Sequence, residues 1–127
     1  MKSWLNRIAN LVSQCRDALE EWRVHQLCAK LQRNVISSLV QVDECRRKNI
    51  PVSWKMAVPD EGCVPYFPFI KRSASFRKRL GDAYNPFLAL LLKDKELKVS
   101  VDSRMVVKCG FFGTGYREYI ILKLNSQ

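Results

Sequence analysis

The stretch that decides the fold lies at the start of the chain, where residues 3–22 are SWLNRIANLVSQCRDALEEW and residues 24–42 are VHQLCAKLQRNVISSLVQV. In residues 3–22, apolar side chains recur at alternating spacings of four and three residues. This pattern predicts an amphipathic helix, and Ser3 is a residue type that caps helix starts. The first stripe consists of Trp4, Ile8, Leu11, Cys15, Ala18 and Trp22, flanked by Leu5, Val12 and Leu19.

A second apolar stripe follows, and it lies roughly opposite the first when both are placed on one helix at about 100° per residue. Its members are Val24, Leu27, Cys28, Leu31, Val35, Leu39 and Val42. A break near Arg23–Gln26 would let both stripes face one core. One unbroken helix would instead bury one stripe and offer the other to a partner. No Gly or Pro marks a break there, so both alternatives stay open.

The helical part ends near residue 49, where the character of the sequence changes. Three cations at residues 46–48 suit a helix C-terminus, and Asn49 followed by Pro51 ends the helix. Prolines then punctuate two short extended pieces, Val52–Val58 and Val64–Ile70. Because a proline lacks the N–H that a strand ladder needs, we expect edge strands or packed loops here.

Two short helices are expected next. Ser73–Leu80 is basic and is followed by Gly81, a residue type that ends helices. Asn85 and Pro86 then suit the cap and first turn of a second short helix that runs through Leu92.

The last third of the chain predicts an antiparallel hairpin. Residues 97–102 alternate apolar and polar side chains, as a half-buried strand does. The runs 104–112 and 116–124 are strand-like, and the residues between them suit a three-residue hairpin loop. Pairing Phe112 with Tyr116 leaves both faces of the hairpin 104–124 largely apolar. The hairpin therefore needs cover on two sides.

These elements predict an α+β fold in which N-terminal amphipathic helices pack on a small antiparallel β-sheet that ends in the C-terminal hairpin. A chain of 127 residues is expected to form a single domain, 1–127. Within it, residues 1–49 are the helical part and residues 50–127 the mixed part that contains the hairpin.

The chain has 22 Lys+Arg and 12 Asp+Glu, and its formal net charge of +10 favours anionic partners. The densest group of cations spans residues 71–79 without an acidic residue. Cations there would neutralise phosphates while neighbouring aromatic rings stack on bases. The candidate nucleic-acid-binding residues are Lys71, Arg72, Phe76, Arg77, Lys78, Arg79 and Tyr84. RNA is the favoured partner, and an anionic membrane is the rival, because clustered cations also bind acidic headgroups.

No motif in the sequence indicates an enzyme. His25 is the only histidine, and the five cysteines contain no C-x-x-C pair. A structural zinc site usually needs two closely spaced ligand pairs, so we expect no metal, no cofactor and no catalytic residues.

The expected compartment follows from the thiols. Five cysteines without a signal peptide predict reduced thiols in an intracellular, reducing compartment, the cytoplasm or nucleus. Residues 1–16 are basic and free of acid, as organellar transit peptides are, so organellar import stays open. No apolar stretch reaches the roughly 20 residues that cross a bilayer.

Two functional hypotheses remain. The first is a small basic nucleic-acid-binding module that uses the cation cluster. The alternative is a protein–protein interaction or assembly module, as a homodimer or with another protein, acting through the N-terminal helices or the hairpin. A compact, basic, cysteine-containing chain without catalytic motifs also has the general look of a virus-encoded accessory protein.

Overall fold

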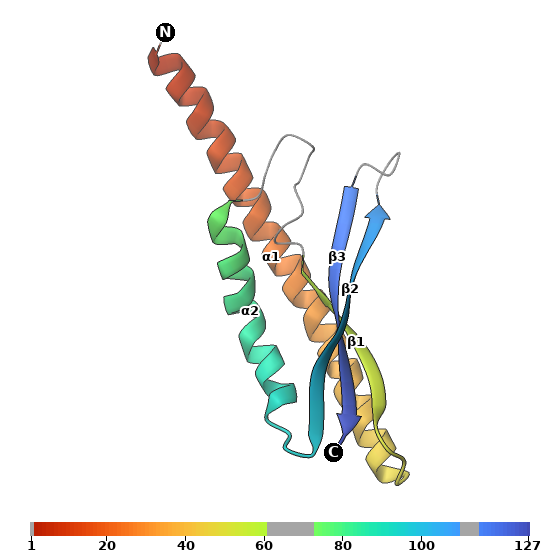
Figure 1. Ribbon diagram of the computed structural model, residues 1–127. Coiled ribbons are helices and arrows are strands. Elements are labelled where there is room, and N and C mark those ends of the chain that lie inside the picture. Colours follow the sequence, from red (N-terminus) through yellow and green to blue (C-terminus); the bar gives the residue numbers. More distant parts are fainter. Residues whose placement is uncertain (1, 61–72, 110–114) are drawn as a thin grey trace.

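The structure is a computed structural model of the chain, and it describes residues 2–60, 73–109 and 115–127. Its elements are helix α1 (Lys2–Arg47), strand β1 (Ser53–Pro59), helix α2 (Ala74–Leu92), strand β2 (Leu97–Cys109) and strand β3 (Gly115–Ser126). Figure 1 shows α1 crossing the sheet and α2 running alongside α1. The predicted α+β fold, with a helical N-terminal part on a small antiparallel sheet and a C-terminal hairpin, is confirmed.

The N-terminal part of the chain is one unbroken helix of 46 residues, about 69 Å long at 1.5 Å per residue. The alternative with a break near Arg23–Gln26 is therefore wrong. The second stripe of α1 faces the sheet and α2, with Leu27 and Leu31 almost fully buried. In the described parts of the chain, the buried residues of α1 are Glu20 and residues from Val24 onward.

The end of α1 confirms the role expected of Asn49. This residue adopts a positive φ of 54°, which reverses the chain direction. Its N–H donates to the carbonyl of Arg46 at 3.2 Å, and the N–H of Ile50 donates to the carbonyl of Cys45 at 2.9 Å. These two bonds form a Schellman motif, which satisfies carbonyls that a helix end otherwise leaves without partners.

The sheet has the order β1-β3-β2 with antiparallel pairing throughout. Strand β3 is central, and its Leu124 is fully buried opposite Trp54 of β1 and Val99 of β2. The core lies between this sheet face and the two helices. Its largest fully buried apolar side chains are Phe76, Leu27, Leu31, Leu80, Leu91 and Leu124.

Helix α2 replaces the two short helices that the sequence predicts. Gly81 and Pro86 lie inside it, although Pro86 removes one helical N–H. The helix continues because Phe76, Leu80 and Leu91 bury one face of it against the core. Burial of a continuous apolar face thus outweighs the local preference for a break.

The hairpin forms with a different register from the predicted one. Tyr116 pairs with Lys108 instead of Phe112, and β2 continues back to Leu97 through an irregularity between Val101 and Ser103. The prediction of the Phe112 pairing is wrong, and Phe112 itself lies outside the described residues, as does the expected piece Val64–Ile70. The observed partner of Tyr116 differs from the predicted one by an even number of residues, so each side chain stays on the hairpin face that was predicted for it.

A buried carboxylate joins the start of α2 to the middle of α1. Glu20 is fully buried and is the first buried residue along the described part of α1. It accepts the backbone N–H of Ser73 at 2.6 Å, the hydroxyl of Ser73, and an N–H of Arg79 at 2.9 Å. One carboxylate therefore caps α2 and compensates the charge of Arg79.

We expect Glu20→Gln to lower the free energy of unfolding by about 2 kcal/mol, because it leaves Arg79 without its counter-charge and removes an acceptor. Urea unfolding followed by circular dichroism measures this change. Asp17→Asn is the matched control, since Asp17 is exposed and its one ion pair among the described residues is a 3.9 Å contact with Arg16. Its expected effect is below about 0.5 kcal/mol. Equal effects of the two substitutions would contradict the structural role of Glu20.

A second ion pair ties the other end of α1 to the turn before β2. Arg46 lies 2.7 Å from the Oδ2 of Asp94, whose Oδ1 accepts the N–H of Glu96 at 3.0 Å. The hydrogen bond from Arg46 holds the pKa of Asp94 below its ordinary value.

This lowered pKa predicts a dependence of stability on pH. The contribution is fully present above the ordinary carboxyl pKa of about 4 and is lost as the pH falls through the lower folded pKa. We therefore expect Arg46→Gln to make stability fall less steeply below about pH 4. Urea unfolding at a series of pH values tests this, with Arg47→Gln as the exposed control. If the free energy of unfolding falls equally steeply below pH 4 in the wild type and the Arg46 variant, the role of this pair is refuted.

Candidate interaction surfaces

The structure divides the predicted cation cluster. Lys71 and Arg72 lie outside the described residues. Arg77 and Lys78 are exposed in the first turns of α2, and neither makes an ion pair within the described parts of the chain. Arg79 is partly buried in its salt bridge with Glu20. Two cations, Arg77 and Lys78, are thus presented to solvent by the described part of the cluster.

The two aromatic candidates are core residues. Phe76 is 0% exposed and Tyr84 is 5% exposed, and the Tyr84 hydroxyl donates to the carbonyl of Pro59 at 2.5 Å. Their predicted role as surfaces that stack on bases is wrong, because no ring face is accessible. Both rings lie on the helix face that packs on the core, and the apolar spacing of α2 is the signal that indicates this.

Among the described residues, most of the strongly exposed apolar side chains of α1 lie in its first half. We call this surface the outer stripe and define it as Trp4, Leu5, Ile8, Leu11, Val12, Cys15, Ala18, Leu19 and Trp22. Its large apolar side chains are 40% to 63% exposed, with Trp4 and Leu11 at the upper end. Figure 1 shows this half of α1 extending past the start of α2.

The described parts of the chain leave the outer stripe exposed. Apolar residues change sides of α1 between Trp22 and Val24, so the outer stripe points away from the core that the second stripe builds. Because α1 is unbroken, no bend brings the two stripes to one side. The sequence-based alternative in which one stripe is buried and the other exposed is the one that the structure adopts.

The hairpin exposes a smaller apolar surface. Val106 is 61% exposed and shares a face with Tyr116, which is 43% exposed. Met105 and Val107, on the opposite face, are 44% and 41% exposed. The face of Val106 also carries Lys108 and the ion pair of Arg104 with Glu118, so the described part of this face is more polar than the sequence predicts.

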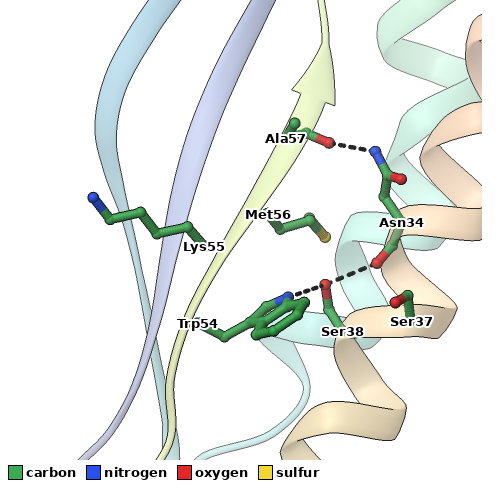
Figure 2. Close-up of a pocket in the computed structure, with 7 residues that line it drawn as sticks. All are labelled: Asn34, Ser37, Ser38, Trp54, Lys55, Met56 and Ala57. Carbon is green, nitrogen blue, oxygen red and sulfur yellow. Dashed lines mark hydrogen bonds between the residues drawn. The ribbon is translucent and has the colours of Figure 1, made fainter.

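A polar hollow of about 130 Å³ lies between α1 and β1 (Figure 2). Polar side chains in it bond across the contact: Asn34 donates to the backbone carbonyl of Ala57 at 2.8 Å, and Trp54 donates to the Ser38 hydroxyl at 3.0 Å. Lys55 points away from the helix. Small-molecule sites usually measure about 300–1,000 Å³, so we interpret the hollow as part of the contact between α1 and β1.

The only histidine and its neighbouring cysteine do not form an activated pair. His25 is exposed, and the thiol of Cys28 donates to the carbonyl of Ala83 at 3.6 Å. Burial raises the pKa of the Cys28 thiol, which disfavours the nucleophilic thiolate. Among the described residues, no three His, Cys, Asp or Glu side chains gather as metal ligands. In the same part of the chain, no helix is long and apolar enough to cross a membrane.

Sequence reasoning did not find Glu20. It stands beside Glu21 as one of two identical carboxylates, and no local pattern shows that one is buried and the other exposed. Its partners lie 53 and 59 residues further along the chain.

Comparison of the chain with protein-family models, curated proteins and solved structures gives no match.

Proposed function

We propose that the protein is a non-enzymatic assembly module whose copies associate through the outer stripe of α1. The observation that supports this most is the unbroken helix, which directs an apolar face of nine residues away from its own core. Apolar patches of this kind on otherwise folded proteins mark interaction sites. A second copy of the chain is the occupant that the surface area and the local charge favour.

The surface area supports association. The chain exposes 9061 Å², whereas a compact monomer of 14.8 kDa exposes roughly 7,000 Å² by the scaling of surface with mass. The excess is about 2,000 Å² per chain, or about 4,000 Å² for two chains, and obligate homodimers bury about 2,000–5,000 Å² in total.

The local charge also permits two copies to meet. Residues 3–22 have a net charge of −1, from two cations against three anions, although the whole chain is at +10. These ionic residues are Arg7, Arg16, Asp17, Glu20 and Glu21. The excess of positive charge therefore lies outside the segment that would pair.

We expect Leu11→Lys to convert the assembled protein into a monomer of 14.8 kDa, because it places a charge in the middle of the apolar interface. Light scattering coupled to size exclusion measures the mass. Leu92→Lys is the matched control: Leu92 is 70% exposed at the end of α2, and its substitution should leave the assembly intact. A wild-type protein that stays monomeric up to several hundred micromolar, or equal behaviour of the two variants, would reject the proposal.

Binding of nucleic acid is the second candidate function. Arg77 and Lys78 favour it, as adjacent exposed cations without ion pairs in the described parts of a chain whose net charge is +10. The sequence shortly before them contains two more cations, Lys71 and Arg72.

For this candidate, we expect the double substitution Arg77→Gln and Lys78→Gln to weaken binding of an unstructured single-stranded RNA. The slope of log affinity against log salt should fall by about 1.4, the value for two lost phosphate contacts. Fluorescence anisotropy at several salt concentrations measures both quantities. Lys93→Gln with Lys95→Gln removes the same charge from another exposed site. If this control pair has the same effect, or the wild type fails to bind at low salt, the cation cluster is not an RNA site.

A further inference from the structure

We infer that two copies pair their α1 helices in antiparallel orientation, with residues 4–22 of one chain against the same residues of its partner. This inference rests on the proposed self-assembly and adds the register to it. The outer stripe has the spacing of a heptad repeat, whose seam positions are conventionally called a and d. Ile8, Cys15 and Trp22 occupy the a positions, and Trp4, Leu11 and Ala18 occupy the d positions.

In an antiparallel pair, each a residue faces a d residue of the partner. The numbering therefore gives the layers of the interface, that is, the pairs of residues that face each other. Trp4 faces the partner's Trp22 at either end of the contact. Ile8 faces the partner's Ala18, and Leu11 faces the partner's Cys15. A large side chain thus meets a small one in each inner layer, which lets the layers interdigitate.

The positions beside the seam are complementary in the same register. On one side of the seam, Leu5 meets the partner's Leu19, and Val12 meets its own copy. On the other side, Arg7 meets the partner's Glu21, while Gln14 meets its own copy. By the two-fold symmetry, Glu21 also meets the partner's Arg7, so each dimer gains two ion pairs.

Arg7 and Glu21 have no partner of their own within the described parts of the chain. Both side chains are exposed, and neither makes an ion pair there. Glu20, the neighbour of Glu21, is buried against α2. The two adjacent carboxylates therefore point to two different partners, one within the chain and one in the second copy.

A parallel pair lacks this complementarity. In a parallel coiled coil, the residue before an a position contacts the partner residue five positions further on. Arg7 would then lie beside the partner's Val12, and Gln14 beside the partner's Leu19. Glu21 would find no cation, so the antiparallel register is the one that the charges favour.

Helix α2 leaves room for this contact. Glu20 lies on the side of α1 away from the seam, where α2 begins, so α2 does not obstruct the partner helix. The helix of the partner runs past the N-terminus of the first chain before its own covered half begins. The two cores are thus held at opposite ends of the paired segment.

Charge reversal tests the register. We expect Arg7→Glu and Glu21→Arg, each alone, to raise the dissociation constant of the dimer about tenfold, because each replaces two attractive contacts with two repulsive ones. The double variant should return to within about threefold of the wild type. Mixing the two single variants should give a heterodimer with both attractive contacts restored. Sedimentation equilibrium of dilution series measures these constants, and about 1 M salt should reduce the differences.

Arg33→Glu is the control for net charge, because Arg33 is exposed on α1 outside residues 4–22. It should change the dissociation constant less than twofold. If the wild type associates but the double variant and the mixture are no tighter than the single variants, the antiparallel register is wrong and self-assembly stands. If the wild type is monomeric, both the register and the proposed assembly fail.

Discussion

Burial of one side of α1 is the constraint on which the rest of the structure depends. The sheet and α2 both pack on the stripe that contains Leu27 and Leu31, and these side chains are almost fully buried. Glu20 and Arg46 fix the two ends of this contact through α2 and the turn before β2. Because the apolar residues of the unbroken α1 change sides between Trp22 and Val24, covering the apolar side of its second half leaves the apolar side of its first half pointing away from the core. The exposed stripe is a direct consequence of how the core is built.

The sequence predicts the parts of the fold that depend on local periodicity. The two stripes of α1, the reversal at Asn49 and the sharing of side chains between the two hairpin faces all follow from spacing and residue type. The single α2 did not follow, because Gly81 and Pro86 favour a break that only the assembled core outweighs. Nor did the hairpin register, since shifting one strand by an even number of residues leaves the faces unchanged. Local patterns therefore give the elements and their faces, and tertiary contacts give their lengths and pairing.

The candidate nucleic-acid-binding residues depend even more on tertiary contacts that local patterns do not reveal. A run of cations in a sequence has the same appearance whether its members are free or paired, yet Arg79 is held by a carboxylate 59 residues away while Arg77 and Lys78 face solvent. An aromatic residue inside such a run can likewise be exposed or buried, and Phe76 is buried because it lies on the face of α2 that packs on the core. The burial of an ionic or aromatic residue depends on contacts distant in sequence, so composition alone overestimates the number of residues available to a ligand.

The two proposed functions use separate surfaces, and this separation has a physical consequence. The outer stripe is apolar, and its segment has a net charge of −1. Arg77 and Lys78 are instead exposed in the first turns of α2, a helix whose start binds Glu20 on another side of α1. Pairing through the stripe would join two such basic surfaces in one particle without burying either. Two exposed cations on one chain give weak attraction to phosphates, but a linked pair of sites gains from the effective concentration of the second. Assembly and anion binding would then be coupled, and any loss of the α1 contact would also weaken binding to a long polyanion.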